Sequence, residues 1–187
     1  WAKSRTQTYG HMLYDTVRGQ KHLNSDTVDS QVTDTQLTFH ATDGFTVSGS
    51  SGELNDATGA PNNYIAWCWK AGGAPSADGK IKIDETESNI SDLVTSTGAS
   101  LTPTRMSAST KTGFSITTYS IGSDPGANHF TIPHGLNKTP EVVIVKNIVQ
   151  PGHATGSQQW CIYHHSEPTK AAHLNRGDVN FSTGTLE

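Results

Sequence analysis

The chain has little charge, few cysteines and no long apolar run. Only 16% of its 187 residues are charged, and the net charge is −4 at pH 7. Because no basic face is present, the sequence predicts no nucleic-acid partner. No apolar run approaches bilayer-spanning length, so we expect no membrane insertion. No signal peptide follows the start at Trp1, and a chain that opens on Trp is typical of a fragment or a processed product.

Cysteine is limited to Cys68 and Cys161, which stand far apart inside apolar runs. Two cysteines make no disulfide framework, so we interpret them as buried thiols that pack like small hydrophobic residues. A disulfide between them stays open as an alternative.

The chain is rich in the residues of turns and strand edges. Hydrophobic residues reach only 33%, and much of the remainder is Gly, Ser, Thr, Asn and Asp. Asp43-Gly44 between the alternating runs 37–39 and 45–47 predicts a β-hairpin. Further strands are expected at 64–69 (buried on both faces), 80–83, 114–119, 142–145 and 160–164. The fold predicted is all-β: an antiparallel, jelly-roll-like β-sandwich.

One short helix is expected around Ile90, Leu93 and Val94, which follow the i, i+3, i+4 spacing of a helix face. It would lie in a segment rich in Ser, Thr and Gly, residues 74–112. We interpret that segment as a linker, or as an arm that lies on a neighbour.

Two stretches of the chain resemble each other. Residues 3–24 contain K-S-R, M-L-Y-D and H-L-N, and residues 146–175 contain K-N-I, C-I-Y-H and H-L-N in the same order. Such an internal repeat predicts a duplicated β unit. We therefore expect a first unit at 1–73, incomplete at its N-terminal side, and a related second unit at 113–187, incomplete at its C-terminal side.

The repeat also indicates missing strands. The second half has no counterpart of Tyr64 to Lys70, and the first half keeps only the tail of the 114–145 region. An open sheet with unpaired edges promotes association. The missing strands are therefore expected from the other half, from further sequence, or from a neighbouring subunit.

No constellation of residues predicts catalysis, a metal site or a cofactor. Nine histidines are present, but no H-x-H, H-E-x-x-H or zinc-type cysteine pair occurs. A triad of Asp15, His22 and Ser25 can be written on paper, yet no G-x-S-x-G elbow supports it. Trp67 and Trp69 share a strand face and are expected in the core. Trp160 and Tyr163, beside a polar loop, are the candidate glycan contacts.

The ordered motifs resemble those of structural proteins from marine tailed phages. The run Y-I-A-W-C-W-K-A-G-G at 64–73 carries the likeness, with His134-Gly135-Leu136, Thr139-Pro140 and the strand 142–147. The resemblance implies a virion component: a tail fibre, an adhesin or a capsid-decoration module. It implies no catalytic residue.

The function predicted is therefore a non-enzymatic virion module, located in the extracellular phage particle. Its partners would be copies of itself, other virion proteins, or a host surface glycan. The alternative is a carbohydrate-binding, lectin-like β-sandwich that uses Trp160 and Tyr163. A hydrolase is a third, more distant reading.

Overall fold

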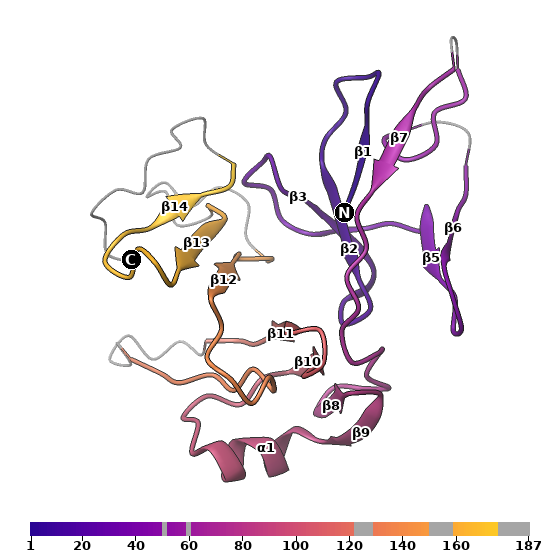
Figure 1. The fold of residues 1–187 in the computed structure, drawn as a ribbon. Coiled ribbons are helices and arrows are strands. Elements are labelled where there is room, and N and C mark those ends of the chain that lie inside the picture. The colour runs from indigo at the N-terminus through magenta and orange to yellow at the C-terminus, as the bar shows by residue number, and fades with distance from the viewer. Residues whose placement is uncertain (50–51, 59–60, 122–128, 150–158, 176–187) are drawn as a thin grey trace. The chain divides into compact units, whose positions relative to one another are not determined.

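A computed structural model describes residues 1–49, 52–58, 61–121, 129–149 and 159–175 (Figure 1). The chain forms two compact units. We call them the terminal unit (1–15, 19–68 and 140–187) and the middle unit (16–18 and 69–139). Short strands dominate both units, and most of their pairings are antiparallel. The predicted all-β, sandwich-like fold is confirmed.

The largest sheet of the terminal unit has the strand order β4-β3-β2-β1-β7. Its strands are β1 (Ala2–Ser4), β2 (Met12–Asp15), β3 (Gly19–Asn24), β4 (Val32–Thr33) and β7 (Tyr64–Ala66). All of its pairings are antiparallel. A second sheet of this unit has the order β12-β13-β14, with β12 (Val142–Val145), β13 (Cys161–His164) and β14 (Ala172–His173).

The two sequence repeats correspond to the same structural element. Residues 3–24 belong to the antiparallel meander β1-β2-β3, and residues 146–175 follow β12 into the meander completed by β13 and β14. We call these the first and the second meander. In each, the Tyr that the repeats share lies on the middle strand and the His lies on the third strand. The internal likeness found in the sequence is therefore visible in the strand order.

The predicted hairpin is present as β5 (Leu37–Phe39) and β6 (Phe45–Val47). Gly44 adopts the left-handed conformation that the tight turn requires. Leu37 packs with Met12 and Leu54, so the hairpin covers part of one face of the five-stranded sheet. This small apolar cluster forms a core of the terminal unit.

The middle unit contains a four-stranded sheet of order β11-β10-β8-β9 and one helix. Its elements are β8 (Lys80–Ile83), β9 (Thr86–Asn89), α1 (Ile90–Thr97), β10 (Arg105–Ser109) and β11 (Phe114–Thr118). The pairing of β8 with β10 is parallel. Ile81, Ile90, Met106 and Ala108 are buried together, and Leu93 of α1 packs against them. The expected helix is confirmed.

Gly72 lies where the chain passes over the two parallel strands of this sheet. A Cβ at this position would lie 2.1 Å from the carbonyl oxygen of Lys82 and 2.2 Å from that of Ala108. The carbonyl of Gly72 accepts a hydrogen bond of 3.0 Å from the Glu85 amide. Only glycine permits so close an approach of backbone to backbone.

Three sequence interpretations differ from the structure. Residues 74–112, interpreted as a linker or arm, form β8, β9, α1 and β10 and supply the core of the middle unit. Small residues explain the difference, since Ser107 and Ala108 are fully buried in a close-packed strand. The sequence proposed units at 1–73 and 113–187, whereas the compact units of the structure are 1–15, 19–68 and 140–187, and 16–18 and 69–139. The strand expected at 64–69, buried on both faces, ends at Ala66, and most of it is exposed.

Candidate functional site

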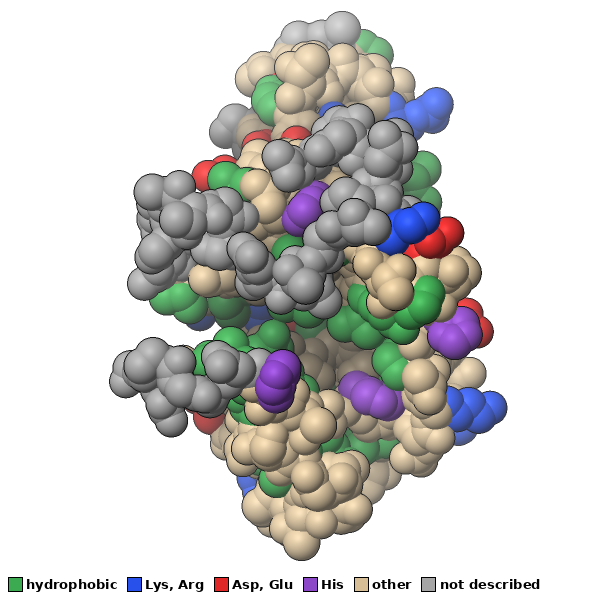
Figure 2. Space-filling view, turned by 90° about the vertical axis from the view of Figure 1, so that its left-hand side faces the viewer, with side chains coloured by type: hydrophobic (Ala, Val, Ile, Leu, Met, Phe, Trp, Pro, Cys, Tyr) green, Lys and Arg blue, Asp and Glu red, His purple; other side chains and the backbone are tan. Residues whose placement is uncertain are grey.

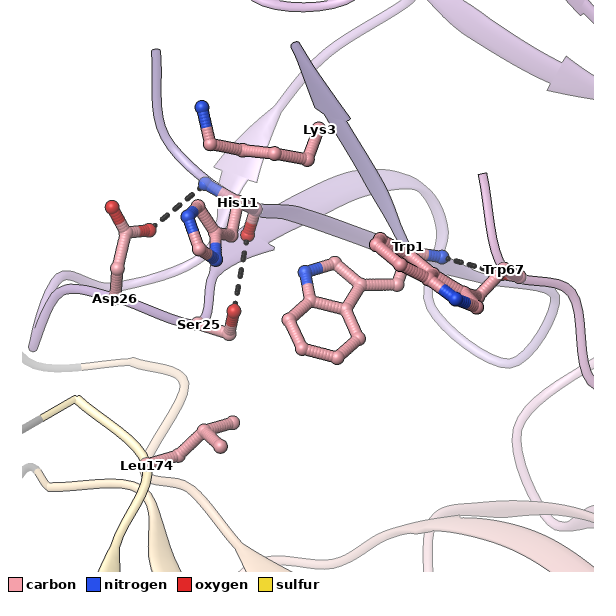
Figure 3. Close-up of a pocket in the computed structure, with 7 residues that line it drawn as sticks. All are labelled: Trp1, Lys3, His11, Ser25, Asp26, Trp67 and Leu174. Carbon is pink, nitrogen blue, oxygen red and sulfur yellow. Dashed lines mark hydrogen bonds between the residues drawn. The ribbon is translucent and has the colours of Figure 1, made fainter. Parts of the chain in front are cut away.

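A cavity of about 300 Å³ opens on the terminal unit (Figure 3). Its aromatic lining comes from Trp1, before β1, and from Trp67, after β7. Loop residues on either side of β2 and β3 supply its polar lining. We call it the aromatic pocket, and its lining residues are Trp1, Lys3, His11, Ser25, Asp26, Trp67 and Leu174.

Strand pairing fixes the two tryptophans of the aromatic pocket. The backbone nitrogen of Trp1 donates to the Trp67 carbonyl at 3.0 Å, and the Trp67 amide donates to the Trp1 carbonyl at 2.8 Å. Their rings lie 5.4 Å apart at an angle of 41°, and the His11 ring lies 6.1 Å from Trp1 (Figure 3). Trp67 is 43% exposed, so an aromatic face is available to a ligand.

The polar side of the aromatic pocket is held by backbone contacts. The Asp26 carboxylate accepts a hydrogen bond of 2.9 Å from the His11 amide, and the Ser25 hydroxyl donates to the His11 carbonyl at 3.4 Å. The Lys3 ammonium donates to the Ser4 and Gln7 carbonyls at 2.9 and 3.0 Å. An aromatic face beside a carboxylate and an imidazole suits a ligand that has both an apolar face and hydroxyl groups.

The triad of Asp15, His22 and Ser25, which the sequence analysis set aside, is not assembled in the structure. His22 Nδ1 lies 3.0 Å from Asp34 Oδ2, and the Tyr14 hydroxyl donates to the same oxygen. Asp15 instead pairs with Gly19 at the turn between β2 and β3. The pattern of the sequence gave no signal for Asp34, which stands between β4 and β5 and is distant from its partners along the chain.

The Tyr14–His22–Asp34 network stabilises the first meander from inside. Burial, followed by the hydrogen bond to Asp34, raises the pKa of Tyr14 and keeps its phenol protonated as a donor. Burial alone would raise the pKa of Asp34. Hydrogen bonds from Tyr14 and the Gln36 amide, together with nearby His22, outweigh it and lower that pKa. All three side chains are used in contacts with one another, so we interpret the network as structural.

The candidate glycan contacts do not have the expected placement. Trp160 is only 5% exposed, and its indole nitrogen donates to the Asn24 carbonyl at 3.1 Å and the Thr27 carbonyl at 3.2 Å. Tyr163 lies half-buried on β13, opposite Val143. The polar loop beside Trp160 does not predict exposure, because the ring turns inward to bind backbone carbonyls. Trp67 and Trp69, which the sequence pattern assigned to the core, are instead 43% and 53% exposed.

The cysteines are free thiols as interpreted, but their burial differs from the expectation. Both are free thiols, and Cys68 is exposed, whereas Cys161 is partly buried. Burial raises the pKa of the Cys161 thiol, which makes it a poor nucleophile at neutral pH.

A second surface feature is β12, whose four residues are all apolar and exposed. The exposed fractions of Val142, Val143, Ile144 and Val145 run from 37% to 51%. β12 is the edge strand of its sheet and pairs with β13 on one side. An exposed apolar edge strand is a template for pairing with another chain. We call the side of β12 that faces away from β13 the outer edge of β12.

On the face in Figure 2, charged side chains are sparse, and hydrophobic side chains reach the surface in patches. Within the described ranges, no cluster of three or more His, Cys, Asp or Glu side chains is arranged to hold a metal ion. No helix in the described part of the chain has the length and apolar character needed to cross a bilayer.

Comparisons with known proteins identify a protein family but no individual relative. No curated protein and no solved structure matches the chain. One protein-family comparison matches residues 1–186, almost the full sequence, and its description is a domain of unknown function, DUF7483. The chain, with its two meanders and its middle unit, therefore belongs to the DUF7483 family.

Proposed function

We propose that the chain is a non-enzymatic structural module of a tailed-phage virion, which assembles with copies of itself or with other virion proteins. The observation that carries the proposal is β12, a four-residue apolar edge strand that is 37–51% exposed. Soluble proteins blunt such edges with charge, proline or a covering element. The motif resemblance to phage structural proteins favours the virion as the setting, in a tail fibre, an adhesin or a capsid decoration.

Light scattering coupled to size-exclusion chromatography tests the assembly of the full chain over a range of concentrations. We expect oligomers that grow with concentration and a shift toward monomer in Ile144→Lys, because a charge on the edge strand opposes pairing. Val149→Lys is the matched control, since Val149 is an exposed apolar residue outside the strands and receives the same change in charge. A wild-type monomer at every concentration would count against the proposal.

A second candidate function, carbohydrate binding, is favoured by one observation. The aromatic pocket places exposed Trp67 next to Trp1 and beside Asp26 and His11. Sugar rings stack on tryptophan faces through their C–H groups, while carboxylates accept hydrogen bonds from their hydroxyls. Host-surface attachment and assembly are compatible roles for one module.

A glycan array tests this second candidate. The chain is expected to bind a defined set of glycans, and Trp67→Ala is expected to lose that binding. Trp69→Ala is the matched control, because Trp69 is also exposed but stacks on Phe114 in the middle unit, 6.1 Å between ring centroids. An array without binding, or equal loss in both variants, would rule out the aromatic pocket as the glycan site.

A further inference from the structure

β12 occupies the same position in the second meander that β1 occupies in the first. Aligning the repeats matches Met12 with Cys161 and Ala2 with Val145. The pairing register follows this alignment, since Ala2 lies opposite Met12 and Val145 lies opposite Cys161. The two meanders are therefore equivalent at the pair that joins the first strand to the middle strand.

The equivalence extends to the lysines that follow this pair. Lys3 and Lys146 align, and each ammonium donates a hydrogen bond to the carbonyl of the next residue. These bonds reach Ser4 at 2.9 Å and Asn147 at 2.6 Å. The lysine that follows β12 thus repeats a side-chain contact made by the lysine of β1.

The outer edge of β1 is covered by a strand of the same chain. β7 pairs with β1 antiparallel, with Lys3 opposite Ile65. Trp1 and Trp67 extend the ladder by exchanging backbone hydrogen bonds of 3.0 and 2.8 Å. The backbone groups of Trp1 and Lys3 therefore face β7, whereas those of Ala2 face β2.

Along Val142–Val145, the outer edge of β12 offers the same groups without a covering strand in the described part of the chain. Beyond β12, the segment 28–31 of the same chain contacts this edge. The Lys146 ammonium donates to the Val28 carbonyl and the Gln31 amide donates to the Ile148 carbonyl, both at 3.1 Å. The His165 amide donates to the Glu141 carbonyl at 2.7 Å, which sets the alternation of the antiparallel ladder. Val143 and Val145 then direct their backbone groups to β13, and Ile144 directs its N–H and C=O to the outer edge. Ile144 aligns with Trp1, whose backbone N and C=O bind Trp67 at the end of β7. The outward N–H and C=O of Ile144 are therefore the equivalent groups in the second meander.

We propose that the outer edge of β12 accepts an added antiparallel strand of the β7 type. The occupant is an extended, uncharged segment with the pattern Tyr-Ile-Ala-Trp, supplied from outside the β12-β13-β14 sheet. Its Trp would exchange backbone hydrogen bonds with Ile144, and its Ile would lie opposite Lys146. The inference rests on the assembly function proposed above and specifies the kind of strand that binds the outer edge of β12. The mode is β-strand addition, in which main-chain bonds supply affinity and side-chain pattern supplies specificity.

A labelled peptide of residues 64–69, Tyr-Ile-Ala-Trp-Cys-Trp, is the probe, titrated onto the full chain and followed by fluorescence anisotropy. We expect saturable one-to-one binding by wild type. Ile144→Pro removes the outward N–H while leaving the β13 ladder intact, so binding should weaken by about tenfold or more. Ile144→Val is the matched control, since it keeps the outward N–H, and it should bind like wild type.

A second measurement on the wild type does not depend on any variant. Hydrogen exchange followed by NMR should show that the Ile144 amide gains protection when the peptide is added, while the Val143 amide, already bonded to β13, does not change. Absence of saturable binding, absence of Ile144 protection, or equal binding of a scrambled peptide would overturn the proposal.

The proposed function and this inference fail separately. Copies that associate through β12 while the peptide does not bind would leave the assembly function standing and overturn the β7-type partner. Peptide binding at Ile144 by a chain that stays monomeric at all concentrations would support the β7-type partner and contradict self-assembly.

Discussion

The two meanders share a strand order but differ in what surrounds them. In the first, the hairpin β5-β6 covers one face, β7 covers the edge, and Met12 on the middle strand is 1% exposed. In the second, the aligned Cys161 is only partly buried, and β12 is exposed along its length. The comparison teaches that an apolar pattern sets strands and their register, whereas burial depends on the elements that the rest of the chain supplies.

The largest expected effect comes from truncating the middle strand of the first meander. Met12→Ala should destabilise the terminal unit by about 3 kcal/mol, because a fully buried side chain leaves a cavity among Leu37 and Leu54. The equivalent Cys161→Ala should cost less than about 1 kcal/mol. Urea denaturation followed by tryptophan fluorescence measures both, and equal costs would contradict the difference in packing between the meanders.

The next largest loss of stability is expected at Asp34, whose buried network with Tyr14 and His22 supports the first meander. Among the described residues, the second meander has no such network. Asp34→Asn should cost about 2 kcal/mol at pH 7, since it weakens the bonds from Tyr14 and the contact with His22.

The pH profile tests the same residue. The pKa of Asp34 is lowered in the folded state. Its stabilising contribution is therefore fully present above its unfolded pKa of about 4 and is lost as the pH falls through the folded value. Unfolding measured from pH 7 to pH 2 should show a shallower acid loss in Asp34→Asn than in wild type. Identical slopes would show that the network does not titrate with folding.

A smaller effect is expected at Trp160, which links the second meander to the end of the first. Trp160→Phe keeps an aromatic ring but removes the indole donor to the Asn24 and Thr27 carbonyls. We expect a loss of about 1 kcal/mol in the free energy of unfolding. Trp69→Phe, at an exposed tryptophan of the middle unit, serves as the control and should be close to neutral.

The smallest effect is expected on β12 itself. Ile144→Thr should change the free energy of unfolding by less than about 0.5 kcal/mol, because the side chain is half exposed and threonine also favours strands. Thermal unfolding at low protein concentration measures this change. A large loss of unfolding free energy would mean that the Ile144 side chain is covered in solution. The outer edge of β12 would then already be occupied, as β7 occupies that of β1.

The regular parts of the fold could be predicted from local pattern. Asp43-Gly44 between alternating residues identified the β5-β6 hairpin, and the spacing of Ile90 and Leu93 identified α1. The repeated Tyr and His marked both meanders. In these elements a short segment specifies its own conformation, so a single sequence is sufficient.

The remainder depends on contacts distant in sequence. β10 was missed because Ser107 and Ala108 are small and give a weak strand signal, although both are fully buried in the strand that pairs parallel with β8. Trp67 and Trp160 were assigned to the wrong environments, because whether an aromatic is covered depends on the strands and carbonyls around it. Asp34 reaches Tyr14 and His22 across the sheet, and no spacing rule connects them.

Gly72 is a sequence marker for the fold of the middle unit, in addition to its strands. Any side chain at this position would collide with two carbonyl oxygens that belong to neighbouring strands, so the chain crossing and the parallel pair must change together or not at all. Strand residues can diverge while preserving their apolar character, but this crossing has one permitted occupant. A glycine at the equivalent position is therefore a test for whether a distantly similar chain builds the same sheet.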